Sequence, residues 1–189
     1  MYLRFGKPLA DRCFAALLLL CALPPGLCIA LGLYLFYGKI FFVQKRITQF
    51  ERPFYILKFM TMLPDAQGQP QVTRWGKYLR RSHLDELPQL LNILCGEMSF
   101  VGPRPLLPEY LPRYQEWERH RHQVKGGLTG FAQIHGGQSL DWQRKMQYDA
   151  WYVANCSFGL DCAILWATLS GRSLLHRMQT EKKASEANK

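Results

Sequence analysis

The hydrophobic residues of this chain are concentrated in one N-terminal run that no charge interrupts. The run covers the 25 residues from Phe14 to Gly38, and at about 1.5 Å per helical residue it can cross a hydrocarbon layer of roughly 30 Å. It is longer than the apolar part of a typical secretion signal, and no small-residue cleavage site follows it. The pattern therefore predicts an uncleaved membrane segment.

Two adjacent prolines, Pro24 and Pro25, lie in the middle of this run. Each proline removes a backbone donor and clashes with the preceding turn, so we expect a sharp bend there. Basic residues flank the run on both sides, so the positive-inside rule places both ends on the cytoplasmic face. Residues 1–38 are therefore expected to form a re-entrant membrane anchor, a helix-break-helix that returns to the side it entered. A single membrane-spanning helix kinked at the prolines is an equally supported alternative.

The pattern after residue 38 predicts a small domain over residues 39–180. Two short runs rich in aromatic and β-branched residues are typical of strands, and a polar, turn-rich loop follows them. Leucines then recur every three or four positions up to Gly96, which predicts a helix ending there. The predicted strands are 39–46 and 53–62, the loop is 64–71, and further helices are expected at 109–125, 141–152 and 158–178.

The last two of these helices differ in their expected surroundings. Residues 141–152 are largely polar and are expected to form an exposed helix, whereas 158–178 mix charges with apolar residues. The second pattern suits an amphipathic helix lying in the membrane interface better than a second span. Residues 181–189 are expected to be a polar tail.

The amino-acid composition excludes several classes of protein and indicates the charge of the partner. Hydrophobic residues make up 48% and charged residues 20%, which excludes a collagen-like, coiled-coil or multi-span membrane chain. Lys and Arg number 24 against 14 Asp and Glu, for a net charge of +10, so an anionic partner is expected: nucleic acid, a phosphorylated ligand or an acidic membrane. Six cysteines without a C-x-x-C pair indicate reduced thiols facing a cytoplasm.

Adjacent acids, Asp85 and Glu86, follow a basic stretch and begin the leucine-rich helix. In one interpretation they are structural, with Ser82 as the N-cap and Asp85 closing a capping box. In the other, a carboxylate near a helix N-terminus and next to arginines stays ionised and acts as a nucleophile or metal ligand. Pro88 supports a helix start close to Asp85, since proline is tolerated in the first turn.

Basic residues surround this acidic pair in the sequence. A diphosphate ligand requires several such charges, with Mg²⁺ neutralising the remainder. The same residues could instead form a solvated face or bind anionic lipid headgroups. The residues concerned are Lys58, Arg74, Lys77, Arg80, Arg81 and Arg104.

Three motifs occur in order along the chain: KFMTM at 58–62, TRWGKYLRRSHLDELPQLLNILCGEMSFVGPRPLL at 73–107 and KGGLTGFAQIHG at 125–136. Together they resemble one family, the bacterial sugar transferases of the small monotopic phosphoglycosyl transferase type. The resemblance implies a mainly helical α/β fold, with a re-entrant membrane helix and a small cytoplasmic catalytic domain carrying interfacial amphipathic helices. It also implies a monotopic protein on the cytoplasmic face of the bacterial inner membrane. The family usually has Ser-Pro at the break, where this chain has Leu23-Pro24.

The resemblance implies transfer of a sugar 1-phosphate from a UDP-sugar to a polyprenyl phosphate such as undecaprenyl phosphate, which releases UMP and initiates a lipid-linked glycan. Asp85 would be the nucleophile, forming an acyl-phosphate sugar intermediate that the polyprenyl phosphate displaces. Glu86 would act with Asp85 in placing Mg²⁺. Two negative substrates approach a negative nucleophile, so a metal ion and basic side chains must offset the charge.

By the same resemblance Lys58, Arg80 and Arg104 match basic positions near the phosphates. Asp149 and Tyr152 match positions of less defined role, and Lys125 would compensate for an arginine that the family usually has in the glycine-rich loop. All three are expected at the substrate. The chain departs from the family at Met60, where arginine is usual, and at two places in the glycine-rich loop, Lys125-Gly126-Gly127 and His135-Gly136-Gly137.

The expected partners are a UDP-sugar, polyprenyl phosphate and membrane lipids, without nucleic acid, and a homodimer is expected only by analogy. The alternative from a different class is a non-catalytic, basic, membrane-bound binding module. Such a module would need no carboxylate pair, and its affinity would collapse with salt.

Overall fold

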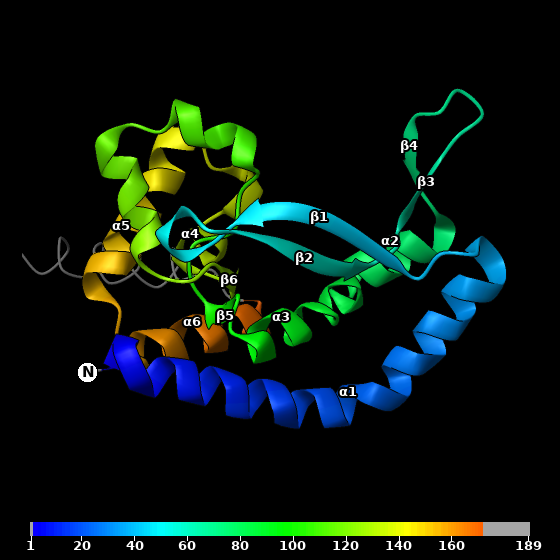
Figure 1. The fold of residues 1–189 in the computed structure, drawn as a ribbon, viewed down its shortest axis with the longest axis horizontal. Coiled ribbons are helices and arrows are strands. Elements are labelled where there is room, and N and C mark those ends of the chain that lie inside the picture. Colours follow the sequence, from blue (N-terminus) through cyan, green and yellow to red (C-terminus); the bar gives the residue numbers. More distant parts are fainter. Residues whose placement is uncertain (1, 172–189) are drawn as a thin grey trace, which may run out of the picture.

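The computed structural model describes residues 2–171, which form a mainly helical molecule (Figure 1). Tyr2–Gly6 form a π-helical turn that leads into the long first helix. The α-helices are α1 (Lys7–Tyr37), α2 (Arg74–Arg81), α3 (Gln89–Cys95), α4 (Phe131–Ile134), α5 (Trp142–Asn155) and α6 (Phe158–Ser170). Short 3₁₀ segments cover Gln49–Glu51, Leu84–Glu86, Pro108–Arg113, Glu116–Gln123 and Gly137–Ser139.

The strands pair in three separate two-stranded sheets. In the largest, β1 (Phe41–Ile47) and β2 (Pro53–Phe59) run antiparallel with Phe41 opposite Phe59, which confirms the two strands predicted from the aromatic runs. The predicted loop at 64–71 closes a small hairpin of β3 (Met62–Pro64) and β4 (Pro70–Val72). The third sheet joins β5 (Ser99–Val101) to β6 (Gly127–Thr129) in parallel, which places a short strand in the glycine-rich loop.

Helix α1 passes through Pro24 and Pro25 without interruption. Its axis nevertheless changes direction near the middle (Figure 1), where the prolines lie. The predicted bend is therefore present, but the predicted break in the helix is not, because helical turns continue on both sides of the two missing donors. The helix ends at Gly38, whose φ of 66° lets its N–H bond to the carbonyl of Tyr34, and β1 begins three residues later.

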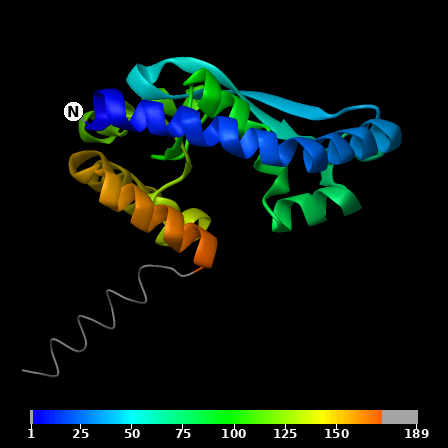
Figure 2. The same ribbon diagram turned by 90° about the horizontal axis from the view of Figure 1, so that it is seen from below.

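Only one side of α1 packs against the rest of the protein. Ala15 and Leu33 are fully buried, whereas a series of leucines is largely exposed. Figure 1 shows the other elements on one side of this helix, and Figure 2 shows from below that α6 begins near the N-terminal end of α1 and then diverges from it. Tyr2–Tyr37 together are long and apolar enough to cross a membrane. The exposed leucines are Leu9, Leu17, Leu20, Leu23, Leu27, Leu31 and Leu35.

Helix α3 lies between α1 and the β1–β2 sheet and joins them through a common core. Ile93 and Leu90 of α3 pack with Ala15 of α1 and with Phe54 and Ile56 of β2. The helix ends at Gly96, whose φ of 81° forms a left-handed cap, as the leucine spacing predicts. This packing fixes the turn that precedes α3 next to β2.

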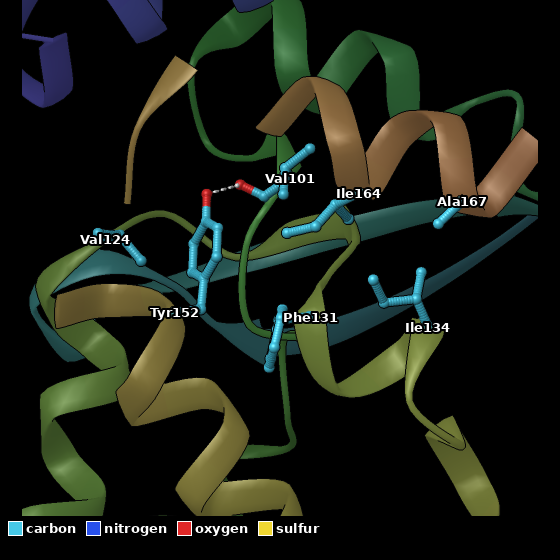
Figure 3. Close-up of a cluster of buried hydrophobic side chains, with 7 residues drawn as sticks. All are labelled: Val101, Val124, Phe131, Ile134, Tyr152, Ile164 and Ala167. Carbon is cyan, nitrogen blue, oxygen red and sulfur yellow. Dashed lines mark hydrogen bonds between the residues drawn. The ribbon is translucent and has the colours of Figure 1, made fainter. Parts of the chain in front are cut away.

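A second core joins α4, α5 and α6 to β5 (Figure 3). Tyr152 of α5 points its hydroxyl at the carbonyl of Val101, 3.1 Å away. The helix predicted at 141–152 is present, but the prediction that it is exposed is wrong. Met146, Asp149 and Tyr152 form a buried face among polar neighbours. Helix α6 exposes Trp166 and Leu169, and its interfacial position stays a prediction. The end of that prediction, 172–178, and the tail at 181–189 lie outside the described residues.

Candidate active site

The acidic pair lies in a tight 3₁₀ turn, Leu84–Glu86, between α2 and α3. Ser82 is the C-cap residue that follows α2, and its hydroxyl donates to the carbonyl of Tyr78 at 2.9 Å. The predicted capping box is therefore wrong, since Ser82 ends one helix instead of beginning another. His83 reverses the chain in the left-handed region, with φ 56°. Such backbone strain in a non-glycine residue is concentrated at functional sites.

Glu86 is held by two cations that come from distant parts of the chain. Lys58 Nζ of β2 lies 2.5 Å from Glu86 Oε1, and Arg104 Nη2, from the segment after β5, lies 3.0 Å from the same oxygen. Burial acts to raise the pKa of Glu86, but the charges of Arg104 and Lys58 outweigh it and lower the pKa below its usual value. Glu86 is therefore ionised and organises the two basic side chains.

Asp85 is 8% exposed and has a different electrostatic environment. Burial raises its pKa, the negative charge of Glu86 adds to the rise, and the positive charges of Lys58 and Arg80 oppose it. The shift in the pKa of Asp85 is the opposite of that in Glu86. Two adjacent carboxylates with opposite pKa shifts are typical of a catalytic pair.

Arg80 completes the basic surroundings of Asp85 from α2. Its Nε donates to the hydroxyl of Thr61 at 2.9 Å. Helix α2 approaches Thr61 so closely that a Cβ on Gly76 would lie 2.1 Å from the Thr61 carbonyl oxygen, so only glycine fits there. The structure thus brings together five of the predicted residues: Lys58, Arg80, Asp85, Glu86 and Arg104.

The structure places the three remaining predicted residues elsewhere. Half-buried Lys125 lies near α1; burial lowers its pKa, and the nearby charges are those of Arg12, Asp11 and Lys7. Asp149 and Tyr152 are 2% and 1% exposed. Neither contacts the acidic pair: Asp149 pairs with Arg121, and Tyr152 bonds to Asp161 at 2.7 Å.

Arg121 is a buried residue of this region that the sequence reasoning missed. It is 3% exposed, and its Nη2 donates to the carbonyl of Arg104 at 2.7 Å. Burial lowers the pKa of its neighbour His122 to about 4, so that ring is neutral near pH 7. The positive charge next to the Arg104 backbone therefore comes from Arg121 and not from His122. The basic run ERHRHQ gave no signal that one of its arginines would be buried.

The acidic pair fits Mg²⁺ only in combination with a ligand. Among residues 2–171 no group of three potential metal-ligating side chains occurs, so these residues form no complete protein site. Mg²⁺ is ordinarily held by one or two carboxylates together with substrate phosphates and water. Asp85 and Glu86 meet that requirement.

A comparison with known proteins identifies the family. The model of a family described as bacterial sugar transferase matches residues 2–173. The chain belongs to the bacterial sugar transferase family. This family membership makes the protein a transferase, and the carboxylate pair with its three cations lies within the matched region.

Curated relatives support the same family. The chain is 45% identical to the uncharacterized sugar transferase EpsL of Bacillus subtilis, over 70% of this chain and 69% of that protein. It is 37% identical to a UDP-glucose:undecaprenyl-phosphate glucose-1-phosphate transferase of Xanthomonas campestris, over 88% of this chain. It is 30% identical to an undecaprenyl-phosphate galactose phosphotransferase of Salmonella typhimurium, over 87%. The chain spans 38% and 40% of the length of these last two sugar transferases.

Proposed function

We propose that this protein transfers a sugar 1-phosphate from a UDP-sugar to undecaprenyl phosphate and releases UMP, the first step of a lipid-linked glycan. The observation that carries the proposal is the ion-paired Glu86, which holds Lys58 and Arg104 beside the buried carboxylate of Asp85. The names of the Xanthomonas and Salmonella relatives support the reaction class. Because they differ in the sugar, they leave the donor sugar of this protein open.

The proposed reaction has two displacements at one phosphorus atom. A carboxylate oxygen of Asp85 attacks the sugar-linked phosphorus, the bond to the bridging oxygen breaks, and UMP leaves with that oxygen. An oxygen of the polyprenyl phosphate then attacks the acyl phosphate and restores the Asp85 carboxylate. Two steps allow a soluble donor and a membrane acceptor to use one nucleophile in turn.

The surrounding residues contribute positive charge in fixed positions. Lys58 and Arg104, oriented by Glu86, and Arg80, oriented by Thr61, offset the negative charge of the donor as it approaches Asp85. Mg²⁺ held by Asp85, Glu86 and the donor phosphates would supply further charge neutralisation.

A non-catalytic basic binding module explains this geometry less well. Electrostatic binding alone requires no buried carboxylate, and burying Asp85 has an energetic cost that binding would not repay. The opposite pKa shifts of Asp85 and Glu86 favour catalysis.

The decisive experiment measures UMP release from a panel of UDP-sugars by the membrane-bound protein, with and without undecaprenyl phosphate. We expect one or a few donors to yield UMP, and EDTA to remove the activity until Mg²⁺ is added back. A short burst of UMP without the acceptor is expected from the covalent step. If no donor yields UMP from folded protein in the presence of Mg²⁺, the proposed function is wrong.

We further propose that the protein is monotopic on the cytoplasmic face of the bacterial inner membrane, with α1 as a re-entrant helix. The open apolar face of α1 and the position of the other elements on one side of it support this placement (Figure 1). The exposed apolar side chains of α6 suit the interface beside it.

This topology predicts that a reporter at the N-terminus and one at the C-terminus are both reached only after the inner membrane is permeabilised. The reason is that both flanks of α1 are basic and favour the cytoplasm. A cytoplasmic marker protein provides the control for membrane integrity. Labelling of the two ends on opposite sides would replace the re-entrant helix by a single span.

A further inference from the structure

The segment Pro103-Arg104-Pro105 is held in place by hydrogen bonds to each of its three carbonyl groups. The carbonyl of Pro103 accepts from the N–H of Gly127 at 3.0 Å, and that of Pro105 accepts from Arg46 Nη1 at 3.2 Å. The carbonyl between them, that of Arg104, accepts from Arg121 Nη2 at 2.7 Å. Pro105 also restricts the backbone of Arg104 to extended conformations.

Arg121 is itself held on three sides. Its Nη1 donates to the hydroxyl of Tyr114 at 2.9 Å, and its Nη2 lies 2.9 Å from the carboxylate of Asp149 on α5. The side chains of Arg121 and Asp149 are 2% and 3% exposed, so the pair is screened from solvent. A buried charge pair of this kind has a desolvation cost, and only the planar fork of arginine reaches all three partners at once.

We propose that Arg121, held by Asp149 and Tyr114, is a positioning residue for Arg104. The proposal rests on the proposed function, in which Arg104 contacts the donor phosphates. The Arg104 side chain is 43% exposed and has many rotamers. Anchoring its carbonyl fixes the backbone from which this side chain extends, and therefore keeps the guanidinium within reach of Glu86. Asp149, expected from the sequence at the substrate, acts through Arg121 instead.

A double-mutant cycle tests this role. Arg121→Lys is expected to lower kcat/KM for UMP release about tenfold in the wild-type background and by less than about twofold in an Arg104→Ala background, because the two residues share one function. Arg119→Lys is the matched control, since Arg119 lies in the same 3₁₀ segment but pairs with Glu51 at the surface. Equal factors for Arg121→Lys in the two backgrounds would show a general structural role and overturn the proposal.

Hydrogen exchange gives a readout that does not depend on turnover. Two amides donate to carbonyls of residues 103–106: that of Ile47 to Leu106 and that of Gly127 to Pro103, each at 3.0 Å. Both should exchange faster in Arg121→Lys and at the wild-type rate in Arg119→Lys. Asp149→Asn, which keeps the side-chain shape, is expected to give the same pattern more weakly and serves if Arg121→Lys does not fold. Unchanged exchange in both variants contradicts the positioning role. Absence of UMP release from the wild type contradicts the proposed function alone.

Discussion

Asp85→Asn is expected to reduce UMP release by at least about 10³-fold and, in the same protein, to raise the melting temperature. The loss of activity follows because an amide cannot form the acyl phosphate, and removing a nucleophile costs several orders of magnitude. The gain in stability follows from the raised pKa of Asp85. Between the usual pKa of 3.8 and the raised one, the folded protein binds more protons than the unfolded chain, so stability falls as the pH rises through this window. Near pH 7 the ionised carboxylate therefore destabilises the fold, and asparagine removes that cost.

Turnover, thermal unfolding and the pH profile measured on the same preparations test this prediction. Glu116→Gln makes the same acid-to-amide change at an exposed position and should alter neither property. The acid limb of the wild-type profile should have a pKa above 3.8, since attack is lost when Asp85 takes up a proton. Full activity in Asp85→Asn would show that another group is the nucleophile. A lower melting temperature with no activity would show instead that Asp85 has a structural role.

Lys7→Met is expected to lower the free energy of unfolding by about 3 kcal/mol, because it leaves a buried carboxylate without its cation. Lys7 Nζ lies 2.5 Å from Asp161 Oδ2, and the two side chains are 6% and 7% exposed. Asp161 also accepts from the hydroxyls of Tyr2 at 2.6 Å and Tyr152 at 2.7 Å, which cannot replace a positive charge. This cluster joins the start of α1 to α5 and α6.

Denaturant unfolding in one detergent or nanodisc preparation measures the effect. Arg4→Met, at an exposed position on the same N-terminal segment, is the control and should change stability by less than about 0.5 kcal/mol. Combining Lys7→Met with Asp161→Asn should restore part of the loss, since the unpaired charge is then gone. If Lys7→Met unfolds at the wild-type denaturant concentration, the ion pair contributes nothing to stability.

The sequence predicted well those features that depend on neighbouring residues. The aromatic runs became β1 and β2, and Gly96 ends α3 with a left-handed cap. The set of Lys58, Arg80, Asp85, Glu86 and Arg104 came from motifs rather than from spacing, and the structure brings these residues together. Helix α1 bends at its prolines without a break. The break was predicted wrongly because the positions of the prolines do not show how much helix the surrounding packing preserves.

The errors concern contacts between residues far apart in the chain. Ser82 ends α2 because the chain turns at His83, which a capping motif does not reveal. Arg121 and Asp149 appear in polar stretches that ordinarily face solvent, and each is buried only because the other is its partner. Lys7 and Asp161 are separated by 154 positions, so no local pattern connects them. Partners of buried charges require the folded structure.

In the proposed function, the short connection after α1 determines how the enzyme would meet its lipid acceptor. Three residues separate Tyr37 from β1, and α3 packs directly on α1 beside the turn that holds Asp85 and Glu86. The carboxylates therefore keep a constant distance from the helix that we propose enters the bilayer, unlike those of a domain on a flexible tether. With that distance fixed, the proposed acceptor would reach Asp85 by lateral diffusion within one leaflet. The encounter would then be a search in two dimensions, whose rate depends on the surface density of the lipid.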